Sequence, residues 1–137
     1  MDDCLFCKIA ERDIPCEKVY EDQDVLAFLD IHPINPGHTL VIPKKHAADI
    51  SALTRADFER LMGCVHALAP IVKKAVQADG INIGMNNGGA AGQLVFHAHL
   101  HIIPRYQNDG FRHWHGNPYG NGEIRAVAEK IRSAVAN

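Results

Sequence analysis

The sequence contains no apolar run of 18 residues, and its formal net charge is only −2 over 137 residues. The first absence argues against a membrane-spanning helix. The second gives no electrostatic basis for binding nucleic acid or an anionic membrane surface. No basic segment followed by an apolar stretch opens the chain, so no secretory signal is expected. We therefore expect a cytoplasmic protein whose main ligand is a small molecule.

Cysteine is scarce as well, and two of the four cysteines form the short motif CLFC at Cys4 and Cys7. Without a secretory signal these thiols should stay reduced. Their two-residue gap allows both to bind one tetrahedral zinc ion, which needs two further ligands. His46 and His97 complete such a set if the fold brings them together. The zinc would then be structural, because protein fills every position. The alternative is two partly buried cysteines without a metal.

The periodicity of the chain predicts one α+β domain over residues 1–137. Strand-like segments separated by turn residues cover 18–22, 25–31, 38–43, 81–87 and 94–103. A long helix should begin after Thr54, bend at Pro70 and end at Gly80 in a left-handed conformation. A second amphipathic helix is expected at 123–135, after an irregular segment at 106–122. Short connections favour a five-stranded antiparallel meander with the helices on one face.

The last predicted strand contains FHAHLHIIP, in which His97, His99 and His101 occupy alternate positions. Alternate residues of a strand share a face, so the histidines form a row whose ends lie about 13 Å apart. One zinc ion cannot hold all three, because its ligands lie far closer together than that. The histidines are therefore expected to do different work along an elongated ligand.

The segment NNGGAAGQ precedes this strand and contains Asn86, Gly92 and Gln93. Its glycines permit a backbone that points several N–H groups at one phosphate, although an ordinary glycine-rich hairpin has the same composition. A phosphate held there would be within reach of His99 and His101. One neutral histidine could attack phosphorus while the other neutralises an oxygen. A catalytic metal on these two histidines is the alternative, but no carboxylate is expected nearby to complete it.

The pattern HAHLHII resembles the signature of the histidine triad (HIT) superfamily of nucleotide hydrolases and transferases. The segments CLFCKI, VLAFLDIHPINPGHTLVIPKKH and GQLVFHAHLHIIPR follow in the order and spacing of the HINT branch, which includes nucleoside phosphoramidases. Together they span most of residues 4–105. The resemblance implies a HIT fold and a homodimer in which the sheet continues from one copy to the other. The long helix and residues 81–86 would lie at that interface.

The resemblance also implies a role for individual residues. His99 would be the nucleophile, His101 would contact the transferred phosphate, and His38 would line the phosphate site. The remaining implied ligands are Asn86, Gly92 and Gln93 for phosphate, Asp30 for the ribose hydroxyls, Phe6, Phe28 and Ile31 for the purine, and Cys4, Cys7, His46 and His97 for one structural zinc per chain. Two features depart from animal relatives. Leu94 replaces a serine and offers no hydroxyl near the leaving group, and the tail with His113, Trp114 and His115 has no counterpart.

The implied function is hydrolysis of the bond between a nucleoside α-phosphate and its leaving group through a nucleotidyl-histidine intermediate. The substrate would be a purine nucleotide or nucleoside phosphoramidate. A dinucleoside polyphosphate is the alternative substrate, and a non-enzymatic nucleotide-binding scaffold is the alternative class of function. The intact set of His99, His101 and His38 favours an enzyme.

Overall fold

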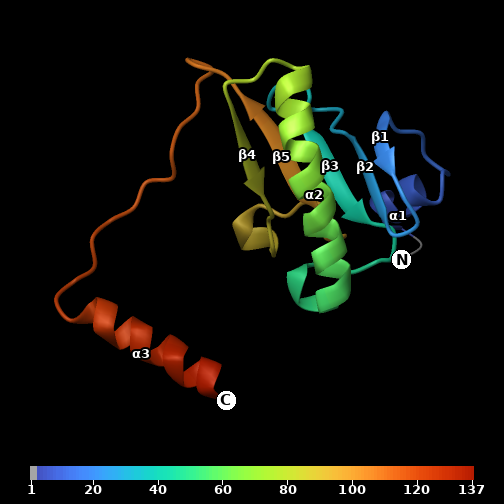
Figure 1. Ribbon diagram of the computed structural model, residues 1–137. Helices are drawn as coiled ribbons and strands as arrows, with labels where there is room; N and C mark the ends of the chain where they lie inside the picture. Colours follow the sequence, from blue (N-terminus) through green and yellow to red (C-terminus); the bar gives the residue numbers. More distant parts are fainter. Residues whose placement is uncertain (1–2) are drawn as a thin grey trace.

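A computed structural model describes residues 3–137, and its centre is one five-stranded sheet (Figure 1). Every neighbouring pair of strands is antiparallel, which confirms the predicted α+β class. The strands, in the spatial order β1-β2-β3-β5-β4, are β1 (Lys18–Glu21), β2 (Val25–Leu29), β3 (Thr39–Pro43), β5 (Leu100–Arg105) and β4 (Gly80–Gly84). The helices are α1 (Leu5–Ala10), α2 (Arg55–Ala75) and α3 (Glu123–Ala136). A simple meander was the wrong prediction, because β5 lies between β3 and β4.

Helix α2 covers one face of the sheet. Its buried residues Leu61, Val65 and Ala69 pack against the side chains that strands β2, β3 and β5 present on that face. These are Val25, Ala27, Val41, Leu100 and Ile102. Alternate strand residues point to opposite faces, so the intervening residues, including His101, face away from α2.

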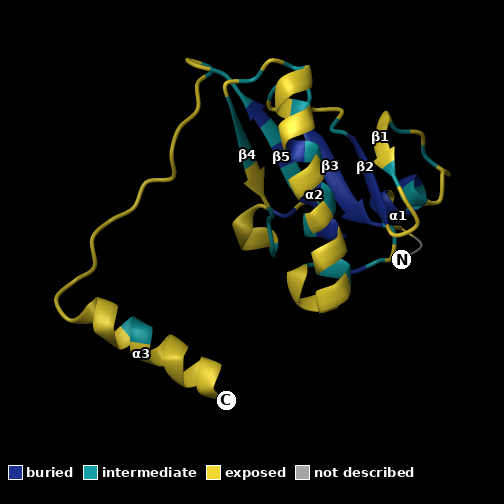
Figure 2. Cartoon of the chain, in the orientation of Figure 1, coloured by how far each residue is buried: buried dark blue, intermediate teal, exposed yellow. Residues whose placement is uncertain are grey.

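The short helix α1 covers the opposite face, where Phe6 and Ile9 join a second apolar cluster. The strand residues of this cluster are Leu26, Phe28, Leu40 and Ile42. The sequence did not predict this helix. The prediction that the long helix and the helix at 123–135 share one face of the sheet is wrong because α3 lies apart from the sheet. The two central strands β2 and β3 are buried on both sides (Figure 2), which explains why they read as nearly continuous apolar runs.

Helix α2 begins as the sequence predicts but ends differently. The Thr54 hydroxyl accepts a hydrogen bond from the Asp57 amide at 3.1 Å, and the helix continues through Pro70. The left-handed residue at its end is Gln77, with φ of 54°, whereas Gly80 is already in β4. The Ala78 amide donates to the Lys73 carbonyl at 2.9 Å, a bond that satisfies an end carbonyl and stabilises this turn.

The last strand begins later than predicted, at Leu100 rather than Leu94. Before Leu100, hydrogen bonds to the loop after β3 and to the end of β3 replace the pairing of the chain with a neighbouring strand. The Ala98 amide donates to the Ala47 carbonyl at 2.7 Å, and the ring of His97 bonds the Pro43 carbonyl. Only His101 of the three histidines therefore lies in the sheet, opposite Leu40 and Gly84.

The chain leaves the sheet after β5 and runs through residues 112–122 without a helix or strand to α3. Figure 1 shows this arm extending past the β4 edge, so that α3 lies apart from the sheet and α2. The apolar stripe of α3 is exposed (Figure 2), with Ile124, Ile131 and Val135 at 60%, 60% and 81%. Among the described residues, no helix combines the length and apolar character needed to cross a membrane.

Candidate functional site

His38 and His101 meet on the face of the sheet that α1 covers. The Ile34 amide donates to His38 Nδ1 at 3.1 Å, so a neutral His38 must carry its proton on Nε2. That Nε2 lies 2.9 Å from His101 Nδ1, which becomes the acceptor. His101 therefore holds its proton on Nε2, a buried atom with no hydrogen-bond partner in the part of the chain that the structure describes. The Ile34 amide, acting through the His38 ring, thus determines that His101 presents an N–H at Nε2.

His99 has the opposite arrangement. Its Nδ1 lies 2.7 Å from the carbonyl oxygen of His97, which can only accept, so Nδ1 carries the proton. The lone pair of a neutral His99 is then on Nε2. The rings of His99 and His101 lie 5.0 Å apart between centroids, at 62°. The site therefore places a ring with a lone pair on Nε2 beside a ring with an N–H on Nε2.

Burial keeps these rings neutral. Desolvation lowers the pKa of His38, His99 and His101, and at His101 burial together with the neighbouring rings of His99 and His38 lowers the pKa to about 4. The nearby Asp30 carboxylate opposes these shifts in all three. Neutral imidazoles at physiological pH are what the donor and acceptor assignments require.

Asp30 lies closer to the histidines than the sequence suggested. One carboxylate oxygen accepts from the His32 amide at 2.8 Å, and the other lies 3.8 Å from His38 Nε2. The expectation that no carboxylate adjoins the histidines was wrong, because the end of β2 runs beside the start of β3. The Asp30, His38 and His101 side chains are close enough to hold a metal ion. The hydrogen bond between the two rings accounts for the same geometry without one.

The glycine-rich loop is braced by Gln93 rather than open for an anion. The amides of Gly88, Ala91, Gly92 and Gln93 all donate to acceptors within the loop. The Gln93 side chain is 3% exposed, and its Nε2 donates to the carbonyls of Ala48 and Val95. Both amide protons of Gln93 thus donate within the protein, and phosphate binding by Gln93 stays a prediction. Gly92 takes a left-handed φ of 92°, and the amide of Asn86 lies against it.

The residues expected to border a purine differ in exposure. Phe6 and Phe28 are buried at 5% and 3%, whereas Ile31 is 84% exposed. The two rings pack edge to face, with centroids 5.6 Å apart. Phe6 also lies edge-on to His99, at 5.1 Å and 87°. The aromatic pair therefore supports the histidines from beneath, and Ile31 supplies the accessible apolar surface.

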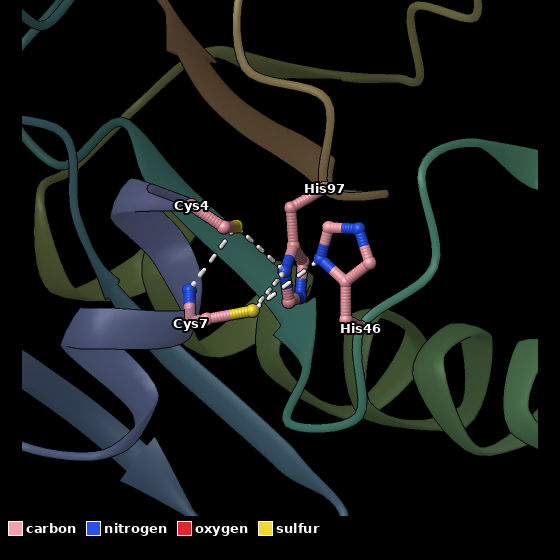
Figure 3. A group of neighbouring side chains, drawn as sticks. All are labelled: Cys4, Cys7, His46 and His97. Carbon is pink, nitrogen blue, oxygen red and sulfur yellow. Dashed lines mark hydrogen bonds between the residues drawn. The ribbon is translucent and has the colours of Figure 1, made fainter. Parts of the chain in front are cut away.

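Cys4, Cys7, His46 and His97 converge from three segments of the chain (Figure 3). The cysteines come from the start of α1, His46 from the loop after β3, and His97 from the segment before β5. Each sulfur lies 3.3 to 3.5 Å from a histidine Nδ1. His97 donates from Nε2 to the Pro43 carbonyl at 2.7 Å, which leaves Nδ1 free to bind an ion.

The donor set fits zinc. Two sulfurs and two imidazole nitrogens at near-tetrahedral spacing form one of the usual structural zinc sets. Burial and the neighbouring Cys4 thiol raise the pKa of Cys7 to about 11. Two thiolates this close together therefore need a bound cation to be stable.

A cavity of about 600 Å³ opens beside His38 and His101. Asn86 and Ile83 border it on one side, and the tail residues Arg112 and Trp114 border it on the other. Trp114 is 98% exposed. The tail that the sequence could not interpret thus forms one wall of a space next to the histidines.

Comparison with known proteins places this arrangement in a family. The HIT domain pattern matches residues 11–108. The chain belongs to the HIT family. The adenosine 5'-monophosphoramidase of Schizosaccharomyces pombe is 43% identical over 138 residues, covering 96% of this chain and 98% of its own length. This likeness assigns the chain to the HINT-like branch.

Solved HIT structures share the fold. The crystal structure of SMU.412c from Streptococcus mutans aligns with a TM-score of 0.93 at 45% identity, covering 98% of this chain and 87% of the other. A zinc-bound histidine triad protein from Mycobacterium smegmatis aligns with a TM-score of 0.77 at 36% identity, covering 97% and 98%.

Sequence reasoning missed the groups that set the roles of the histidines. The Ile34 amide and the carbonyls of Pro43 and His97 fix which nitrogen of each ring carries a proton. These are backbone groups, so no side-chain pattern could reveal them. Helix α1 was missed too, although Cys4 caps it by accepting from the Cys7 amide.

Proposed function

We propose that this HIT protein hydrolyses the bond between the α-phosphorus of a purine nucleotide and its leaving group, with nucleoside phosphoramidates as the preferred substrate class. The observation that carries the proposal is the pairing of two neutral histidines whose Nε2 atoms have opposite roles, one an acceptor and one a donor. His99 offers a lone pair on Nε2, and His101 offers an N–H on Nε2. The likeness to an adenosine 5'-monophosphoramidase supports the substrate class.

The reaction would proceed in two displacements. His99 Nε2 forms a bond to the α-phosphorus, and the leaving group departs with the electron pair of its broken bond and takes up a proton from solvent. Water then attacks the nucleotidyl-histidine, gives up a proton to solvent, releases the nucleoside monophosphate and restores the imidazole. His101 Nε2–H donates to a non-bridging phosphate oxygen in both transition states. Covalent catalysis of this kind replaces one difficult displacement by two easier ones.

Other residues would hold the substrate. Asp30 is partly exposed beside His38, where its carboxylate can accept from ribose hydroxyls, and Ile31 offers apolar surface to the base. Asn86 lies at the cavity beside His101 and can reach the phosphate. In our proposal Gly92 and Gln93 shape the loop, and Phe6 and Phe28 form the floor under the nucleotide.

The cavity between the histidines and the tail is where the leaving group would lie. Its volume of about 600 Å³ accommodates an amine with a sizeable substituent. It also leaves room for a phosphate chain, and Arg105 and Arg112 line it, so a dinucleoside polyphosphate is the second candidate. A binding scaffold without turnover would not need the fixed protons on His99 and His101.

Turnover of an adenosine phosphoramidate and of a dinucleoside polyphosphate by the same preparation tests this. We expect the larger kcat/KM for the phosphoramidate. Rapid quenching without acid should also trap nucleotide on the protein through a phosphorus–nitrogen bond. Tight binding of nucleotide without turnover of either substrate would favour the scaffold instead.

We also propose one structural zinc ion per chain, held by Cys4, Cys7, His46 and His97. The donor set and the zinc-bound relative support it. Zinc at such a site stabilises thiolates and joins α1 to the loops that contain the histidines. Elemental analysis of protein purified without chelator should give one zinc per chain, and its absence would refute the assignment.

The third part of the proposal is a two-fold symmetric dimer formed through β4 and α2. Strand β4 is at the edge of the sheet, where unpaired backbone groups invite a second strand. The arm and α3 extend past that edge, and α3 buries none of its residues against its own chain. A second copy beside β4 would cover the apolar stripe of α3. Light scattering at micromolar concentration should give twice the chain mass, and a monomer mass would exclude the dimer.

A further inference from the structure

The ring of Phe6 contacts His97 of the proposed metal-ligand cluster and His99 of the proposed catalytic cluster. The first cluster is Cys4, Cys7, His46 and His97, and the second is Asp30, His38, His99 and His101. The Phe6 centroid lies 5.1 Å from that of His99 and 6.0 Å from that of His97, and both contacts are edge to face. Phe28 lies 5.6 Å away on a further side, and Phe6 is only 5% exposed. Edge-to-face packing among buried rings is directional, so a shift of Phe6 changes the space available to the His99 ring.

The metal-ligand cluster determines where Phe6 lies. Phe6 stands between Cys4 and Cys7 in α1, a helix of six residues. So short a helix is unstable in isolation and depends on its tertiary contacts. Two of those contacts are the cysteines, whose sulfurs adjoin the Nδ1 atoms of His46 and His97. A bound ion would therefore pin α1, and with it Phe6, to the body of the protein.

A second connection runs through His97. Its ring belongs to the cluster, and its carbonyl accepts the Nδ1–H of His99 at 2.7 Å. The Pro43 carbonyl holds the same ring from its other nitrogen. The carbonyl of His97 thus fixes the His99 ring at Nδ1. The ring of Phe6, which stands between Cys4 and Cys7 in the sequence, packs edge to face with the same ring.

We propose that Phe6 is a positioning residue that couples the Cys4/Cys7/His46/His97 cluster to the orientation of His99. Metal binding at this cluster then changes the rate of turnover, although the cluster residues do not contact the substrate. The proposal rests on the function proposed above for His99. It separates two roles for Phe6. A residue that only borders the purine would change nucleotide affinity, whereas a positioning residue changes kcat.

The first test is Phe6→Leu in the zinc-loaded protein, with Ile9→Val as the control. Ile9 is buried on the same helix and in the same apolar cluster. We expect Phe6→Leu to lower kcat at least tenfold, since small displacements of a reacting group can cost about 100-fold, while the Kd for the nucleoside monophosphate changes less than threefold. Ile9→Val should keep both within twofold. A weakened Kd with unchanged kcat would overturn the proposal. If Phe6→Leu does not fold, Phe6→Met takes its place.

The second test asks whether the metal acts through Phe6. Chelation of zinc from the wild-type protein should lower kcat severalfold, and the same treatment of Phe6→Leu should lower it further by less than twofold. Independent, multiplicative effects would contradict the coupling. If chelation unfolds the chain, exchange of zinc for the larger Cd²⁺ replaces it.

An imidazole ¹⁵N spectrum gives a readout that does not need turnover. In the zinc-loaded wild type, His99 should show one slowly exchanging Nδ1–H, which broadens in Phe6→Leu and after metal removal. An unchanged His99 signal in both would refute the coupling, whatever the activity. A protein that gives the expected spectra but hydrolyses neither nucleotide substrate would instead refute the proposed function and leave the coupling standing.

Discussion

His97 and His99 are two residues apart in the sequence, but they use opposite ring nitrogens to bind backbone carbonyls. His97 is bonded through Nε2 to the Pro43 carbonyl, so its Nδ1 faces the two thiols. His99 is bonded through Nδ1 to the His97 carbonyl, so its Nε2 is the free nitrogen. Both rings are buried and have lowered pKa values. Which ring nitrogen a backbone carbonyl holds therefore distinguishes the proposed metal ligand from the proposed nucleophile, and the residue type does not.

The comparison extends to the two clusters. The proposed metal-ligand cluster joins α1 to two loops, and its four side chains face one another. Such an arrangement suits a structural site, in which protein supplies every ligand. The proposed catalytic cluster of Asp30, His38, His99 and His101 ends in the N–H of His101, which has no partner among the residues described. Buried donors rarely stay unpaired, and a catalytic role is one explanation for such a group. Substitutions in the proposed metal-ligand cluster should therefore lower stability, and substitutions in the proposed catalytic cluster should lower kcat.

The largest effect is expected for His99→Ala. Loss of the nucleophile should reduce kcat about 10⁴-fold or more, as for other covalent catalysts, while nucleotide binding stays within about tenfold. The trapped nucleotidyl-protein should disappear. His66→Ala, an exposed position on α2, is the matched control. A His99→Ala protein with near wild-type turnover would favour direct attack by water.

A smaller loss is expected for His101→Ala, which removes one donor to the phosphate. Such a donor contributes about 2.7 to 4 kcal/mol to the transition state, or 10²- to 10³-fold in kcat. The covalent intermediate should still form and be trapped, because His99 keeps its bond to the His97 carbonyl. An intermediate that no longer forms would show that His101 contributes more than charge stabilisation.

Cys4→Ser tests the other cluster, where the effect should fall on stability. Loss of one zinc ligand should reduce metal content and lower the free energy of unfolding by about 2 kcal/mol or more, or at least about 5 °C in Tm. The change in kcat should be smaller than for His101→Ala. Cys16→Ser, outside the cluster, is the control. Unchanged metal content and Tm in Cys4→Ser would reject the site.

The regular parts of this fold could be predicted because they follow from periodicity. The apolar runs at Val25–Leu29 and Thr39–Pro43 are strands, and Thr54 caps α2 as its hydroxyl predicts. The left-handed position at Gln77 was not foreseen, because the hydrogen bond of Ala78 to Lys73 overrides the usual preference for glycine. The order of the last two strands depends on pairing between distant segments, which local patterns do not encode.

The candidate site divides in the same way. The two-residue gap suggested a zinc site at Cys4 and Cys7, with His46 and His97 as further ligands if the fold brought them together, and these four do converge. The loop composition suggested a phosphate cradle, yet Gln93 uses its amide to hold the loop closed. The proton positions on the rings depend on main-chain atoms from other segments, which become neighbours only after folding.

The smallest expected effect concerns pH, and it again separates the clusters. The folded-state pKa of His101 is lowered to about 4, mainly by burial, whereas an unfolded histidine titrates near 6.5. Its neutral form also accepts the His38 Nε2–H, and protonation at Nδ1 would place two donors face to face. The stability that His101 contributes is therefore fully present above about pH 6.5 and is lost as the pH falls toward 4, because the unfolded chain binds the proton first.

The free energy of unfolding, measured by chemical denaturation between pH 4.5 and 7.5, should fall with decreasing pH. His101→Ala should reduce that slope by an amount of at most about 1.4 kcal/mol per pH unit, the value for one proton. His66→Ala should leave it unchanged. An equal slope in His101→Ala and the wild type would mean that His101 takes up its proton at the same pH in the folded and unfolded chains, so that burial does not lower its pKa.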